Sequence, residues 1–341
     1  MSAGSLSLLP PELIRQLCYN LSLNDILNLQ KSHPCLELTI DNVFFVDLKH
    51  MEVDIEARGS VFSLSSPSTS TTFSTTTQSE NWKSILYKSK RISTLLIKKV
   101  DDATDLSALQ AIERAEYRLT DVEIHLVKAD EGTATVSKVA KNHAYRRLTE
   151  FMSNCRRSLK RFRLQTDQSN SIEYLLNGSN AHLIYAHDND SLLQQQLIIP
   201  VFHAINQDSE CPSTVTLRIQ WREKPAMALQ AAFHAALPRS HRSGLQVLKL
   251  DFGFNVASLS YAEIKQILSQ YAPYLNDTRR LQHLVLDLKY STLLASELET
   301  LYSIISRELP DTHRISVYTS ESLPKANAVN KQKHTNRVAC S

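Results

Sequence analysis

The sequence predicts an α/β protein in which strands and amphipathic helices alternate along most of the chain. A short apolar unit, Leu-x-x-Leu-x-Leu or a close variant, recurs with period-two alternation, which is typical of a strand with one buried face. Helical segments between these units favour parallel strands joined by helical crossovers. Only six glycines occur in 341 residues, whereas a doubly wound sheet normally needs glycine at its strand–helix turns. The sequence therefore favours an irregular strand–helix solenoid with a parallel, concave sheet over a doubly wound sheet.

Several copies of the apolar unit are expected to form the strands of this solenoid. The units with the full spacing are Ile92-x-x-Leu95-x-Ile97, Leu119-x-x-Val122-x-Ile124, Leu159-x-x-Phe162-x-Leu164, Leu245-x-x-Leu248-x-Leu250 and Leu281-x-x-Leu284-x-Leu286. Weaker members are Val43-x-x-Val46-x-Leu48, Val215-x-Leu217-x-Ile219, Ile315-x-Val317 and the segment 182–186.

Between the strands, apolar residues recur with the spacing of a helix. Ser260 and Glu263 form a capping box at the start of one such segment. Ile264, Leu268 and Tyr271 then fall on one face of the predicted helix. The same pattern predicts helices over 148–155, 229–236 and 298–305.

Two segments have the composition of disordered chain. In 59–80, Ser and Thr make up 14 of 22 residues and the only charge is Glu80. Such a segment is expected to bury too little apolar area to repay its ordering entropy, so we interpret it as a disordered insert within the first repeat. A serine–proline dipeptide in it, Ser66-Pro67, is a possible phosphorylation site. We also expect the basic tail 320–341 to be disordered.

The N-terminal residues form a helical pattern distinct from the repeats. Pro10 and Pro11 start an apolar helix, and Ser22 or Asn24 can cap a second one. The dipeptide 33–34 breaks the second helix, and a third short helix follows. From physical considerations alone, these helices are a cap for the end of a solenoid.

The same residues resemble the F-box family. The resemblance is carried by Leu9-Pro10, Glu12-Leu13-Ile14, Leu17, Leu21, Asp25-Ile26-Leu27 and Leu29, in the order and spacing of the F-box pattern. It implies a three-helix module over 1–45, followed by a solenoid over 46–319 similar to that of leucine-rich-repeat F-box proteins. It also implies a Skp1-like adaptor as partner and, through it, a cullin–RING ubiquitin ligase. The residues that the resemblance places at the adaptor contact are Leu9, Pro10, Ile14, Leu17, Leu21 and Leu27.

Composition and motifs disfavour several other function classes. The spacing of the glycines excludes GxGxxG and GxxxxGK[ST] loops, and no HExxH or GxSxG motif occurs. We therefore expect no cofactor, no metal and no catalytic residue. The net charge of +3 lies mostly in the tail, which gives no reason to expect nucleic acid as partner. Five unpaired cysteines, and no apolar stretch of membrane-spanning length, favour a reduced, cytoplasmic or nuclear protein without membrane contact.

The leading hypothesis is a non-catalytic substrate receptor of an SCF-type ubiquitin ligase. A receptor of this kind raises the effective concentration of its substrate at the ligase. The alternatives are an adaptor-bound scaffold without a ligase role, a repeat-protein binder whose helices are only a cap, and an α/β enzyme with its site at the strand ends. We expect a protein substrate on the concave sheet face, with Arg163, Tyr185 and Arg218 as anchors on three successive strands.

Overall fold

The computed structural model describes most of the chain in two compact units, Met1–Asp167 and Gln168–Ser341. The described residues are 6–56, 59–75, 82–100, 107–126, 138–166, 170–177, 180–186, 197, 199–206, 212–220, 244–252, 260–276, 281–288, 293–309 and 312–319. The predicted helix over 229–236 and the expected disorder of 320–341 lie outside these residues.

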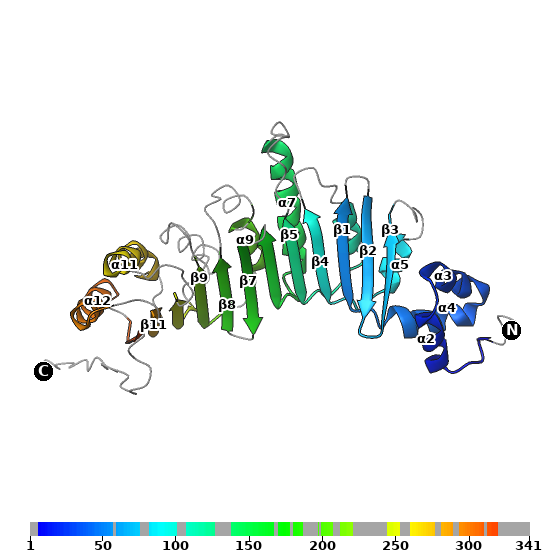
Figure 1. The fold of residues 1–341 in the computed structure, drawn as a ribbon, viewed down its shortest axis with the longest axis horizontal. Helices are drawn as coiled ribbons and strands as arrows, with labels where there is room; N and C mark the ends of the chain where they lie inside the picture. Colours follow the sequence, from blue (N-terminus) through cyan, green and yellow to red (C-terminus); the bar gives the residue numbers. More distant parts are fainter. Residues whose placement is uncertain are drawn as a thin grey trace, which may run out of the picture. The chain divides into compact units, whose positions relative to one another are not determined.

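The first unit begins with three helices at the positions that the sequence predicts (Figure 1). They are α2 (Pro11–Tyr19), α3 (Leu23–Ser32) and α4 (Pro34–Ile40), followed by the π-helical turn η1 (Asp41–Phe45). Ser22 caps α3 by accepting a hydrogen bond from the backbone N–H of Asp25 at 3.3 Å. Proline stands at the first position of α2 and of α4, where its missing N–H costs nothing.

The expected strand at Val43–Leu48 is wrong, because residues 41–45 form the π-helical turn. The neighbouring side chains of Val43, Phe44 and Phe45 are all buried. A strand with one buried face hides only every second residue, so three buried residues in a row need a helical turn. They complete the core of the helical module together with Ile14, Cys18, Ile26, Leu36 and Ile40.

The sheet of the first unit has the order β6-β5-β4-β1-β2-β3. Strands β1, β4, β5 and β6 are parallel, and β2 and β3 continue from β1 as an antiparallel meander. The bounds are β1 (His50–Glu56), β2 (Gly59–Ser66), β3 (Thr69–Ser74), β4 (Thr94–Val100), β5 (Asp121–Leu126) and β6 (Arg161–Thr166).

The expectation of a disordered insert is wrong for residues 59–75, which form β2 and β3. Phe62, Leu64 and Phe73 are buried on one face of this hairpin. The ring of Phe62 stacks on Phe73 at 5.2 Å and on Trp82 at 5.6 Å between centroids. Three apolar residues suffice here because β1 supplies an existing sheet edge, and Ser and Thr suit its other face. Residues 76–80 of the predicted insert lie outside the described part.

Helices cover one face of the sheet in the first unit. They are α5 (Trp82–Lys88), α6 (Ser107–Arg114) and α7 (Lys138–Cys155), and each contacts the next. The strand residues on this face are buried, as the repeating unit predicts, for example Leu95, Val122 and Phe162. The alternate residues point away from the helices and form the open face of the first unit.

The second unit repeats this architecture with the strand order β12-β11-β10-β9-β8-β7. Strands β8 to β12 are parallel. The strand bounds are β7 (Asn170–Asn177), β8 (Asn180–Ala186), β9 (Thr214–Gln220), β10 (Val247–Asp251), β11 (His283–Leu288) and β12 (Arg314–Thr319). Its described helices are α9 (Ile199–Asn206), α11 (Tyr261–Asn276) and α12 (Ala295–Glu308). The prediction of an α/β fold with a mostly parallel sheet is therefore confirmed.

Strand β7 is absent from the prediction and pairs antiparallel with β8. The sequence carries a signal for this hairpin, because Asn177-Gly178 is a favoured two-residue turn between strands. The predicted capping box of α11, by contrast, is present. The backbone N–H of Ser260 donates to Glu263 at 2.8 Å, and the N–H of Glu263 donates to the Ser260 hydroxyl at 3.4 Å.

Candidate functional site

Helix α2 presents apolar residues on two sides, and only one side is needed for the core. Ile14 and Cys18 form the inner side, with exposed fractions of 2% and 1%. Leu13 and Leu17 lie four residues apart on the outer side, where Leu13 is 47% exposed and Leu17 half-buried. The outer side therefore offers apolar surface that nothing in the described chain covers fully.

Other exposed leucines belong to the same helical module. Leu8, just before α2, is 84% exposed, and Leu38 of α4 is 67% exposed. We call Leu8, Leu13 and Leu38 the exposed leucines of the module. The sequence reasoning did not select them, because F-box spacing rather than helical facing guided the choice. A helical projection of 10–19 would have separated Leu13 from Ile14.

The residues expected at an adaptor contact are differently placed. Pro10 is exposed, whereas Leu9, Leu17, Leu21 and Leu27 are half-buried. Ile14 is a correction, because its side chain is buried inside the module and is not available to a partner in this structure. It supports the surface from beneath.

One polar cluster ties the helical module to the first strand–helix repeat. The ammonium group of Lys88, at the end of α5, lies 3.1 Å from Glu37 Oε1 and 3.1 Å from Asp41 Oδ1. Gln30 donates to the same Asp41 oxygen at 2.6 Å. The Lys88 side chain is only 20% exposed, so these contacts are partly shielded from water.

A second cluster joins α2 to the segment before β1. The Oδ2 atom of Asp47 lies 2.9 Å from Arg15 Nε and accepts a hydrogen bond from the Tyr19 hydroxyl at 2.9 Å. Burial, together with this hydrogen bond to Asp47, raises the pKa of Tyr19. The two clusters hold the module against the first repeat, and both belong to the same compact unit.

The open face of the first unit carries a charged cluster on neighbouring strands. Glu123 of β5 pairs in register with Arg163 of β6. Its Oε1 atom lies 2.7 Å from His125 Nε2 and 3.5 Å from Arg163 Nη1. The Arg163 side chain remains 37% exposed, so it can still reach a partner while it is paired with Glu123.

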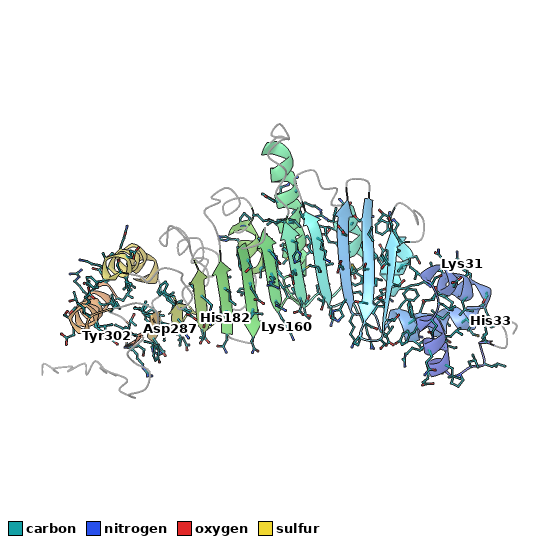
Figure 2. All side chains as sticks on the ribbon, viewed as in Figure 1. Lys31, His33, Lys160, His182, Asp287 and Tyr302 are labelled. Atoms are coloured by element: carbon teal, nitrogen blue, oxygen red, sulfur yellow. The ribbon has the colours of Figure 1, made fainter. Side chains whose placement is uncertain are left out.

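The second unit carries a comparable cluster across β9, β10 and β11. Arg218 Nε lies 3.0 Å from Asp251 Oδ2, and Lys249 Nζ lies 3.5 Å from Asp287 Oδ2. The two aspartates are buried, with exposed fractions of 4% and 3%. His182 of β8, labelled with Asp287 in Figure 2, has its pKa lowered by burial and by the positive charge of Arg218. The cluster is internally charge-balanced, with one basic partner for each carboxylate.

The three expected anchors do not lie on successive strands. Arg163 is on β6 of the first unit, whereas Tyr185 and Arg218 are on β8 and β9 of the second, and β7 intervenes in the chain. The expected facing of Tyr185 is also wrong. It pairs in register with Ile219, and Ile184 pairs with Arg218, so Tyr185 falls on the opposite face of the sheet from Arg218.

Other kinds of site find little support in the residues that the structure describes. They contain no group of three or more His, Cys, Asp or Glu side chains that could hold a metal ion. None of their helices combines the length and apolarity needed to cross a bilayer. Burial raises the pKa of the Cys18 thiol to about 11 and that of Cys155 to about 12, which suppresses the nucleophilic thiolate.

Comparisons with protein-family models, with curated proteins and with solved structures find no match to this chain. The resemblance to the F-box therefore depends on the motif residues themselves. The fold and the exposed surfaces above are the remaining basis for a functional conclusion.

Proposed function

We propose that this chain is a non-catalytic substrate receptor of an SCF-type ubiquitin ligase. In this proposal residues 1–45 are an F-box that binds a Skp1-like adaptor, and the rest is a leucine-rich-repeat-like solenoid that holds a protein substrate. The proposal is supported by the F-box pattern of the sequence, which falls on three consecutive helices, α2, α3 and α4.

The observation that carries the proposal is the apolar surface of the helical module. Three large leucines in a short module are 47% to 84% exposed, although the module already has a full apolar core. Isolated exposed leucines are common on proteins, but several within one small module indicate a protein-binding surface. A helix with a second apolar side is what a helix-packing partner requires.

The attachment of the module supports a receptor role in a second way. Lys88, Glu37 and Asp41 join α4 and η1 to α5, and Arg15 and Asp47 join α2 to the segment before β1. A partner bound to the module would then be held in a fixed relation to the first strands. Such rigidity keeps a high effective concentration at the reacting centre, whereas a long flexible connection lowers it.

The substrate surface in this proposal is the open face of the strands. Arg163 in the first unit and Arg218 in the second are the anchors that we retain, because both side chains are about one-third exposed. Arginine is enriched among the residues that contribute most to protein interfaces. Tyr185 is not retained, since its register places it on the other face.

The test is adaptor capture by the full chain and by matched variants. We expect a purified Skp1-like adaptor to bind the wild-type chain and to bind Leu13→Ala/Leu38→Ala at least about tenfold more weakly, since two truncated anchors can each cost more than about 1 kcal/mol. Leu294→Ala is the control, because Leu294 is 68% exposed but lies in the second unit.

The outcomes separate the alternatives. Equal binding by the double variant and the wild type, with unchanged thermal unfolding, contradicts adaptor binding through these leucines. No adaptor binding by the wild type favours a repeat-protein binder with a helical cap. Adaptor binding without substrate ubiquitination in a reconstituted ligase favours a scaffold.

A further inference from the structure

The turn that joins β2 to β3 places a serine–proline dipeptide at the surface of the first unit. Ser66 pairs in register with Thr69, so Pro67 and Ser68 form a two-residue turn between the strands. Both turn residues are exposed, and Ser66 is half-buried. The Ser66 hydroxyl accepts a hydrogen bond from the backbone N–H of Ser68 at 3.2 Å.

This dipeptide is unique in the sequence. The chain contains eleven prolines, and only Pro67 follows a serine or threonine. A protein kinase that requires proline directly after the acceptor residue therefore has a single candidate acceptor in the whole chain, Ser66.

The turn is connected to helix α2 through a chain of hydrogen bonds. The Ser68 side chain is hydrogen-bonded to the Tyr19 hydroxyl, which in turn donates to Asp47 Oδ2 at 2.9 Å. Arg15, on α2, lies 2.9 Å from the same carboxylate oxygen. Along this chain from the turn, the first charged group is therefore the negative carboxylate of Asp47, and the positive Arg15 lies beyond it.

We propose that Ser66 is a phosphorylation site for a proline-directed protein kinase. The enzyme would transfer the γ-phosphoryl group of MgATP to Ser66 Oγ, with the hydroxyl proton passing to the kinase base and ADP leaving. Strand β3 lies at the end of the sheet order and is paired with β2. An edge hairpin can separate locally from a sheet at a lower cost than a central strand, which lets the segment enter a kinase cleft.

Phosphorylation loosens the contact between the turn and α2. A phosphate carries a charge of about −1.5 to −2 at pH 7, and beside an aspartate it acts by like-charge repulsion. Here it competes with Asp47 for the Tyr19 hydroxyl and for Arg15, and it repels the Asp47 carboxylate. The contacts that hold α2 against the segment before β1 are weakened as a result.

The test uses the full chain, a purified proline-directed kinase and MgATP, without any adaptor. Peptide mapping by mass spectrometry is expected to find phosphate on Ser66 in the wild type and none there in Pro67→Ala. Hydrogen–deuterium exchange of the amides of Pro11–Tyr19 is expected to become several-fold faster on phosphorylation. In Asp47→Asn, where the repelling carboxylate is gone, phosphorylation should leave this exchange rate nearly unchanged.

A charge-mimicking pair provides a second measurement. Ser66→Glu is expected to speed exchange in α2, whereas Thr72→Glu, an exposed position on the same hairpin, is not. Absence of phosphate from Ser66 overturns the site, and phosphate on Ser66 with unchanged exchange in α2 overturns its consequence. Because no adaptor is present, either result is independent of the proposed ligase role.

Discussion

Replacement of Lys88 by methionine tests how the helical module is attached to the first strand–helix repeat. Methionine keeps most of the length and apolar contact of the lysine stem but removes its ammonium group. Glu37 then loses its partner on α5, while Asp41 keeps the hydrogen bond from Gln30 at 2.6 Å. The change therefore isolates the contribution of the charge at this junction.

The expected magnitude follows from the burial of the ammonium group. A hydrogen bond to a charged group contributes about 1.5–3 kcal/mol when shielded, and an exposed ion pair about 0.2–1 kcal/mol. The Lys88 side chain is 20% exposed, but Glu37 is 55% exposed. We therefore expect a loss of about 2 kcal/mol in the free energy of unfolding. In a unit of this size that corresponds to a fall of about 6 °C in Tm.

The assay is thermal and urea unfolding of the full chain, with Lys90→Met as the matched control. Lys90 is exposed in the turn two residues further on, so its replacement should change the free energy of unfolding by less than about 0.5 kcal/mol. Equal stability of the Lys88→Met and Lys90→Met variants would refute the junction as a stabilising contact.

Three further predictions concern single residues. Because the pKa of His182 is lowered in the folded chain, the unfolded chain takes up this proton first as the pH falls below about 7, so stability should decline toward acid; His182→Gln should flatten the dependence of Tm on pH between about 7 and 5, and an unchanged slope would contradict this. Native cysteine labelling with mass mapping should modify exposed Cys35 long before Cys18 and Cys155, whose thiols have a raised pKa. Phe62→Ala should cost about 3–5 kcal/mol in urea unfolding, as expected for a buried aromatic side chain, whereas a loss below about 1 kcal/mol would restore the view of 59–75 as a loose segment.

The strands of the fold could be predicted wherever one face is buried and the other is polar. Leu95, Val122, Leu248 and Leu284 are such positions, and each is at most 1% exposed. The method failed at 43–48 because the period was assigned from three apolar positions while Phe44 and Phe45 were ignored. It failed at 59–75 because composition was given more weight than the alternation of Phe62 and Leu64 with serine.

The candidate surfaces were predictable only in part. The helical module was located correctly, but which of its apolar residues face outward depends on packing among three helices, as the neighbours Leu13 and Ile14 show. On the sheet, a shift of one residue in the assumed alternation exchanged the faces of Tyr185 and His182. Antiparallel β7 carries no Leu-x-x-Leu-x-Leu unit, so the repeat pattern could not place it between the predicted anchors.

Calorimetric titration of a purified Skp1-like adaptor into the full chain tests the central claim most directly. The account predicts a one-to-one complex with a Kd of about 1 μM or tighter, as expected for an interface of standard size. It also predicts a negative heat-capacity change, because the exposed leucines of the module would be buried. No binding at adaptor concentrations of about 100 μM would contradict the account, because a dissociation constant so weak is far above that of a specific, stable interface.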